Sequence, residues 1–90
     1  MIRVAWCESR FRQYDKEGNL YRGKVNPKDI GVMQINTYYH QKAADRMKLD
    51  LTTTEGNMAY AKRLYESEGT TPWNSSSACW IHKNAEVAFK

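Results

Sequence analysis

The chain has 90 residues, which suffices for one domain (1–90) with a small core and leaves no room for a second. Hydrophobic residues make up 41% and charged residues 27%, a balance that excludes a disordered or membrane-embedded chain. The net charge of +4 arises from basic residues interspersed with acids, so we expect a mixed solvated surface and no nucleic-acid partner.

Targeting signals are missing from the sequence as given. No stretch approaches the roughly 20 apolar residues of a membrane-spanning helix, so we expect no integral membrane segment. The N-terminus also lacks the basic and apolar regions of a secretory signal. We expect any leader to lie outside the given sequence.

The first predicted helix runs from Ile2 to about Arg12, because apolar residues recur there at three- and four-residue steps on two sides. Residues 13–27 then hold few aliphatic side chains and several glycine, asparagine and aspartate residues. This composition favours an ordered surface loop with turns and one short hairpin between Leu20 and Val25.

The middle of the chain contains one ambiguous segment and one predicted helix. Residues 30–36 are apolar and short, and Gly31 marks a place where the backbone turns or approaches another group closely. Their secondary structure stays open at this point. Thr37 is placed to cap a helix that runs to about Lys48.

The clearest helical pattern follows. Thr52 and Glu55 have the spacing of a capping box, the residues after them continue at helical period, and Gly69 supplies the stop. After Pro72, Asn74 or one of residues 75–77 can cap a final short helix.

Taken together, these elements predict a mainly α domain of the α+β kind, with one long loop or short hairpin. The final helix carries Cys79 and Trp80, and the pattern from Ile81 to Lys90 is marginal.

The two cysteines, Cys7 and Cys79, lie near opposite ends of the chain, a spacing that fits neither a zinc site nor a redox pair. They form either one disulfide that closes a loop of about seventy residues or two buried free thiols. For a small basic domain of extracellular type we favour the disulfide.

Glu8 is the first functional candidate. On the first helix it lies four residues after Val4 and three before Phe11, so it shares a face with apolar side chains. A carboxylate is seldom placed there without a partner, and such positions suit acid/base work. The alternative is a helical ion pair with Arg12, four residues later.

Three sequence segments carry a resemblance to a known family. Glu8-Ser9 after an apolar helix, Gly-Val-Met-Gln-Ile-Asn at 31–36, and Glu-Gly-Asn-Met-Ala-Tyr at 55–60 resemble motifs of the lytic transglycosylase SLT domain. That domain is related to goose-type lysozymes, and the similarity covers about Val4 to Trp80. It implies a lysozyme-like fold and cleavage of peptidoglycan glycan strands.

The resemblance implies one catalytic acid/base, Glu8. To donate a proton near neutral pH, Glu8 needs a raised pKa, and enclosure by apolar groups such as Trp6 and Phe11 is one way to raise it. Within the motif at 31–36 it implies contacts to sugar and peptide, and it places the helix at 55–60 near the cleft. The substrate-binding positions expected on this basis are Ser9, Met33, Gln34, Asn36, Tyr60, Trp73 and Asn74. Met33 and Tyr60 are also ordinary core residues at helical or apolar positions.

The sequence departs from the family at two places. Residues 28–30 are Lys-Asp-Ile where relatives have small residues, so the turn before Gly31 differs in shape. The family's Ala-Tyr-Asn-x-Gly motif is absent, and residues 72–77 occupy the comparable region. Trp73 and Asn74 are the candidates for the role of the missing tyrosine.

Three functions are compatible with these residues. A lytic transglycosylase needs one carboxyl group, because the substrate's own C6 hydroxyl closes a 1,6-anhydro ring. A lysozyme-type hydrolase needs a second, for which Asp15, Glu17 or Asp29 is available. A non-catalytic peptidoglycan-binding domain would instead stack Trp73, Trp80 and Tyr38 on sugar rings.

Other expectations concern location and partners. The resemblance implies a secreted, periplasmic or cell-wall-associated protein that binds peptidoglycan, and we expect a monomer. No cofactor or metal is indicated, because His40 and His82 are isolated from other ligand residues in the sequence.

Overall fold

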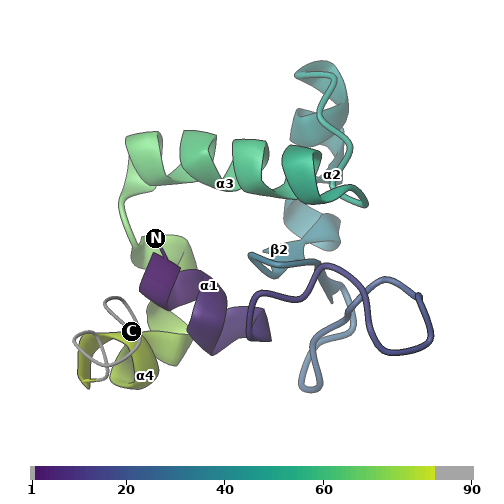
Figure 1. Cartoon of the computed structure of the whole chain (residues 1–90). Helices are drawn as coiled ribbons and strands as arrows, with labels where there is room; N and C mark the ends of the chain where they lie inside the picture. Colours follow the sequence, from purple (N-terminus) through teal and green to yellow (C-terminus); the bar gives the residue numbers. More distant parts are fainter. Residues whose placement is uncertain (1, 83–90) are drawn as a thin grey trace.

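The computed structural model describes residues 2–82 of the chain (Figure 1). The elements in order are α1 (Ile2–Ser9), β1 (Asp29–Ile30), β2 (Ile35–Asn36), α2 (Thr37–Arg46), α3 (Thr54–Glu68), the 3₁₀ helix η1 (Thr71–Ser76) and α4 (Ser77–His82). The prediction of a small, mainly helical domain is therefore confirmed. Most of the predicted marginal tail, residues 83–90, lies outside the described residues.

Helix α1 ends at Ser9, three residues before the predicted end. Arg10 and Phe11 adopt left-handed backbone conformations, with φ of 57° and 63°, and these cannot continue a right-handed helix. The predicted packing on two sides is also wrong at the ends, because Ile2 and Phe11 are 62% and 50% exposed. Only one side of α1 is buried in the core.

The ambiguous segment at 30–36 is a β-hairpin. Ile30 of β1 pairs with Ile35 of β2, and residues 31–34 form the turn between them. The preceding loop adds isolated bridges, one of which pairs Tyr14 with Leu20. The hairpin predicted between Leu20 and Val25 is therefore shifted, and Val25 is fully exposed.

The hairpin turn is buried, and side chains from distant parts of the chain satisfy its backbone. Those that bond the backbone of Val32 or Met33 are Ser9, Gln13, Asn57 and Trp73. A Cβ at Gly31 would lie 2.4 Å from the Asn57 amide nitrogen, and φ there is 78°, so only glycine fits this position. Paired in this way, the turn can lie inside the domain without a desolvation penalty.

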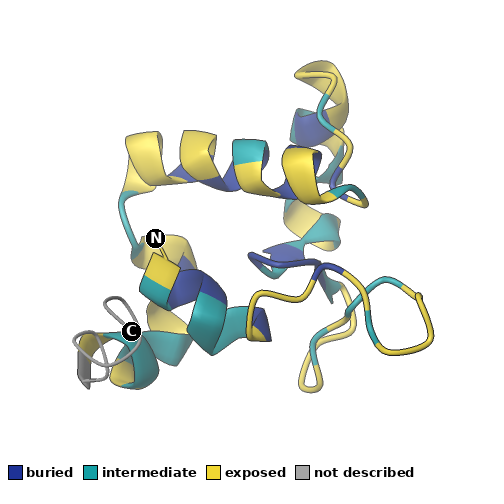
Figure 2. Cartoon of the chain, in the orientation of Figure 1, coloured by how far each residue is buried: buried dark blue, intermediate teal, exposed yellow. Residues whose placement is uncertain are grey.

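The core is one cluster that the hairpin and helices enclose (dark blue in Figure 2). Its members are Val4, Ala5, Ile30, Val32, Met33, Ile35, Ala44, Leu51, Tyr60, Ala61, Leu64 and Trp73. Within residues 2–82, no helix combines the length and apolar character needed to cross a bilayer.

The helix caps differ from the predicted ones by one residue. Asn36, not Thr37, caps α2, because its side chain accepts a hydrogen bond from the Tyr39 N–H. Thr53, not Thr52, caps α3 through the Gly56 N–H. Helix α2 also ends at Arg46 rather than near Lys48, whereas the predicted stop of α3 at Gly69 is confirmed.

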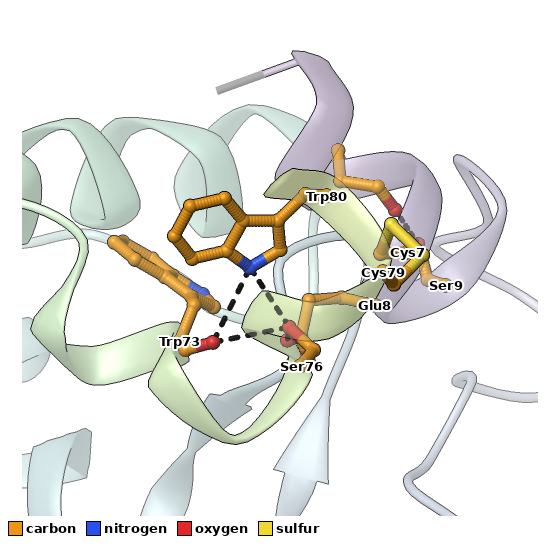
Figure 3. Close-up of a disulfide and its surroundings, with 8 residues drawn as sticks. Cys7, Glu8, Ser9, Trp73, Ser76, Cys79 and Trp80 are labelled. Carbon is orange, nitrogen blue, oxygen red and sulfur yellow. Dashed lines mark hydrogen bonds between the residues drawn. A yellow bond between two sulfur atoms is a disulfide. The ribbon is translucent and has the colours of Figure 1, made fainter. Parts of the chain in front are cut away.

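The C-terminal part folds back on α1. Cys7 of α1 and Cys79 of α4 form a disulfide across 72 residues of sequence, which confirms the favoured pairing (Figure 3). Cys79 and Trp80 lie in a short final helix, as predicted, and that helix follows η1 directly at Ser77. The disulfide thereby holds α4 and the end of η1 beside the last turn of α1.

Candidate active site

Glu8 lies where two cavities adjoin. The larger has a volume of about 670 Å³ and the smaller about 290 Å³. Four residues line both cavities: Glu8, Asp29, Gln34 and Ser75. We refer to the two cavities together as the Glu8 cleft. Two carboxyl groups, those of Glu8 and Asp29, therefore lie where the two parts of the cleft meet.

The Glu8 carboxylate is held by one side chain from η1. The Ser76 hydroxyl donates a hydrogen bond to Glu8 Oε2 (Figure 3). The same hydroxyl oxygen accepts a bond of 3.1 Å from the Trp80 indole N–H and lies 3.1 Å from the Trp73 carbonyl oxygen. Glu8 is thus oriented by a network that joins α1 to η1 and α4.

The surroundings of Glu8 favour its protonated form. Burial raises the pKa of Glu8 above its ordinary value, because the ionised carboxylate loses hydration there. The nearby charge of Asp29 raises that pKa further, whereas the hydrogen bond from Ser76 opposes the rise. The net direction is upward, as a proton donor near neutral pH requires.

The alternative ion pair between Glu8 and Arg12 is not formed. Because α1 ends at Ser9, the helical spacing is not continued to Arg12. The Arg12 guanidinium instead donates to the Ser9 carbonyl and to the Tyr21 hydroxyl, and it stacks 4.5 Å from the Tyr21 ring centre. Glu8 is therefore a partly buried carboxyl whose described partner is a hydroxyl.

The two aromatic residues predicted to enclose Glu8 lie in different places. Trp6 lines the larger cavity together with Glu8. Phe11 follows the left-handed turn after α1 and lines a separate apolar groove that contains no Glu8. The Phe11 side chain therefore contributes nothing to the wall of the cleft.

Ser9 and Met33 support the cleft from beneath. Ser9 borders the larger cavity but is only 1% exposed, and its hydroxyl is occupied by bonds to the backbone of Ala5 and Val32. Met33 is buried in the core and lines the apolar groove. The Ser9 hydroxyl therefore holds the hairpin turn in place, and Met33 is a core residue of that turn.

Gln34 and Asn36 line the cleft itself. Gln34 borders both cavities, in a left-handed conformation with φ of 52°, and its amide donates to the Gly31 carbonyl. Asn36 borders the smaller cavity and donates to the Asp29 carboxylate at 2.9 Å. The left-handed backbone of Gln34 is strained for a residue other than glycine, and such strain is typical of functional sites.

The remaining predicted contacts differ in position. Trp73 lines the smaller cavity, although it is only 2% exposed and its indole N–H is used by the Met33 carbonyl. Tyr60 is a core residue whose hydroxyl bonds His40, and it borders neither cavity. Asn74 is exposed and also borders neither.

Sequence reasoning did not identify Ser76 as a partner of Glu8. The signal was indirect: Glu8 follows Cys7 by one residue, and Ser76 precedes Cys79 by three. A disulfide between the two cysteines brings these neighbours together, one helical turn apart on α4 and η1. The predicted cysteine pairing therefore also indicated which residues lie near Glu8.

Two other cleft residues carry charge or proton-transfer capacity. His40 and Glu68 line the smaller cavity, from α2 and α3 respectively.

In residues 2–82, groups of three or more His, Cys, Asp or Glu side chains arranged to hold a metal ion are not found. Comparison of the chain with protein families, curated proteins and solved structures finds no match.

Proposed function

We propose that this chain is a peptidoglycan lytic transglycosylase with a small lysozyme-like fold. It cleaves the β-1,4 bond between N-acetylmuramic acid and N-acetylglucosamine and leaves a 1,6-anhydro end, with Glu8 as its single acid/base. The observation that carries the proposal is the placement of a partly buried Glu8, with a raised pKa, where the two parts of a polar cleft adjoin. On this proposal the protein acts outside the cytoplasm as a monomer.

In the first step, protonated Glu8 donates its proton to the glycosidic oxygen, and the bond between that oxygen and C1 of the muramic acid breaks. In the second step, the C6 hydroxyl of the same sugar attacks C1. Its proton passes to the Glu8 carboxylate, which restores the acid. One carboxyl group therefore completes the cycle, and no water is consumed.

The hydrogen-bond network suits both forms of Glu8. When Glu8 is ionised, the Ser76 hydroxyl donates to it. When Glu8 is protonated and not engaged with substrate, it can donate to the Ser76 oxygen, whose own proton turns to the Trp73 carbonyl 3.1 Å away. The Trp80 N–H occupies the remaining lone pair in both states. No polar group loses its partner as the proton moves.

A lysozyme-type hydrolase is the second candidate, and Asp29 is the observation in its favour. Asp29 lines both cavities beside Glu8, so it can orient a water molecule. Asp15 instead accepts hydrogen bonds within its own turn, from the Glu17 and Asn19 N–H groups. Mass spectrometry of the released muropeptides separates the candidates, since anhydro ends indicate a transglycosylase and reducing ends a hydrolase.

The decisive variant is Glu8→Gln, which keeps the shape of the side chain and removes the transferable proton. We expect muropeptide release from purified sacculi to fall by about a hundredfold to ten-thousandfold. Glu17→Gln, in an exposed loop outside the cleft, is the matched control and should retain full activity. Release by Glu8→Gln at near the wild-type rate would show that Glu8 is not the acid.

The stability of the Glu8→Gln variant should not fall together with its activity. Because folding raises the pKa of Glu8, the stability linked to this group is complete below its unfolded pKa and is lost as pH rises through the folded pKa. Above that range the wild type carries a buried charge that Glu8→Gln lacks. Above that pH range the Tm of the variant should therefore equal or exceed that of the wild type, so that a loss of activity could not be attributed to a loss of fold.

A further inference from the structure

Residues 74–81, which form the end of η1 and most of α4, are attached to the rest of the domain by few bonds. We refer to them as the clamp segment. The disulfide joins this segment to the last turn of α1 (Figure 3). Among the described residues, one side-chain hydrogen bond joins it to an element other than η1 and α4, from Ser76 to Glu8. The indole N–H of Trp80 bonds within η1, and its ring packs against the core.

The part of η1 before the clamp segment is fixed independently of the disulfide. Trp73 is buried in the core, and its indole N–H donates to the Met33 carbonyl. Segments with few buried contacts open locally at a lower free energy than the core does. We therefore expect a break of the disulfide to release the clamp segment while the core stays folded up to Trp73.

The disulfide lies within reach of a small reductant. Both cysteines are half-buried, and Cys7 lines the larger cavity of the Glu8 cleft. A thiolate of a dithiol attacks one sulfur, which breaks the S–S bond and forms a mixed disulfide. The second thiol then closes the reagent into its own disulfide. Two electrons and two protons thereby pass from the dithiol to the protein, which is left with two cysteine thiols.

Release of the clamp segment changes the surroundings of Glu8 in two opposing ways. Exposure to water lowers the pKa of Glu8 toward its ordinary value, whereas loss of the Ser76 hydrogen bond raises it. Burial has the larger effect on this pKa in the folded protein, so we expect the pKa to fall on release. The ionisable groups of the cleft that carry charge near Glu8 lie outside the clamp segment and stay in place. They are Asp29, Arg10, Arg12, Lys24, His40 and Glu68.

We propose that the disulfide between Cys7 and Cys79 is a redox switch for glycan cleavage. When it is closed, it holds Ser76 on Glu8 and completes the active site. When a dithiol reduces it, the clamp segment leaves α1 and cleavage falls. This inference rests on the proposed function, because it describes the regulation of the same site. The enzyme is then inactive where dithiols keep its cysteines reduced and becomes active in an oxidising compartment.

The test compares the oxidised wild type with the wild type reduced by dithiothreitol, at a temperature where circular dichroism shows that the helices are retained. We expect kcat/KM for glycan strands to fall about tenfold or more on reduction and to recover on reoxidation. The basic limb of the pH–rate profile should move to lower pH. The double variant Cys7→Ser, Cys79→Ser should behave like the reduced wild type, and dithiothreitol should not change its rate, which controls for the reagent.

The matched variant is Ser76→Ala in the oxidised protein, which removes the hydroxyl and keeps the clamp segment on α1. Its basic limb should move to higher pH, opposite to the effect of reduction. A basic limb that moves upward on reduction, or does not move, overturns the inference. Loss of the whole helical signal on reduction at every temperature also overturns it, because the disulfide would then stabilise the entire fold rather than control the site.

A titration of the Glu8 carboxyl by NMR separates this inference from the proposed function, because it does not depend on cleavage. The pKa of Glu8 should be lower in the reduced protein than in the oxidised protein. An oxidised wild type that cleaves no glycan strand contradicts the proposed function. An identical titration of Glu8 in the two redox states contradicts the switch.

Discussion

Two hollows of similar size and different composition border helix α1. One is the larger cavity of the Glu8 cleft, and the other is an apolar groove of about 570 Å³ that Ile2, Phe11 and Met33 help to line. Among the described residues of the groove none carries a carboxyl group. Volume therefore does not distinguish the two hollows, whereas the carboxyl group with the raised pKa lies only in the polar one among the described residues.

The hairpin turn at 31–34 forms the wall between the two hollows. Met33 and Gln34 are neighbours in sequence, yet Met33 lines the groove and Gln34 lines both parts of the cleft. The left-handed backbone of Gln34 supports this reversal. Four side chains hold the backbone of this turn by hydrogen bonds. The shape of both hollows therefore depends on one small polar network.

Breaking the disulfide should give the largest change in stability. Cys7 and Cys79 close a loop of 72 residues, and the loop-entropy relation gives about 4 kcal/mol for a loop of that length. At about 0.1 kcal/mol per residue, this approaches half of the total stability of a chain of this size. Urea unfolding of the double variant Cys7→Ser, Cys79→Ser measures the loss.

The disulfide also distinguishes the two hollows. It holds Ser76 near Glu8 of the cleft, whereas the apolar groove is lined by neither cysteine. We therefore expect reductant to lower glycan cleavage at temperatures where the chain is still folded. Unfolding curves and cleavage rates that are identical with and without reductant would contradict this assignment.

Asn57→Leu should produce the second-largest effect. Asn57 is fully buried, accepts a bond from the Met33 N–H and donates to the Ile30 and Leu51 carbonyls. Leucine removes these three bonds and leaves the buried Met33 N–H without its acceptor, at a cost of about 3 kcal/mol. The control is Met58→Ser at the next position, which is 52% exposed on the groove side and should change stability by less than about 1 kcal/mol.

Equal unfolding free energies for Asn57→Leu and Met58→Ser would show that the hydrogen bonds of Asn57 do not stabilise the buried turn. Thermal or urea unfolding monitored by circular dichroism gives the comparison directly. Asn57→Leu should also reduce cleavage, because Gln34 would no longer be held at the junction of the two cavities.

Local patterns in the sequence predicted the helices well and their caps less well. Asn36 and Thr37 are adjacent, and both carry an oxygen that can cap a helix, as do Thr52 and Thr53. The residue that caps is the one with an extended backbone, and this depends on the strand or turn before it. Tertiary structure thus decides between neighbours that local propensity does not distinguish.

In the cleft, too, local sequence patterns do not predict contacts between residues far apart in the chain. Glu8 was singled out by its position on an amphipathic helix, and its partial burial agrees with that reasoning. Ser76 was not, because one serine in a run of three has no periodic signature. Its contact with Glu8 spans 68 residues and depends on a disulfide elsewhere in the two helices. Such contacts follow from chain topology rather than from local spacing.

The smallest of the expected effects concerns the pH dependence of cleavage. Ser76→Ala removes the hydrogen bond that lowers the pKa of Glu8, so this pKa should rise further. The basic limb of the pH–rate profile should then move to higher pH, with a loss of about threefold in the maximal rate from poorer orientation. Stability should begin to fall at a correspondingly higher pH, since a raised carboxyl pKa is linked to stability that is lost as pH rises through it.

Two further serine variants make this result specific to the cleft. Ser76→Thr keeps the hydroxyl and should restore the wild-type profile. Ser67→Ala removes a hydroxyl that bonds only within α3, at the Leu64 carbonyl, and should leave the profile unchanged. If Ser76→Ala shifts the basic limb downward, or not at all, the Ser76 hydroxyl does not lower the pKa of Glu8. The two hollows would then differ in the composition of their lining without this difference in the control of a proton.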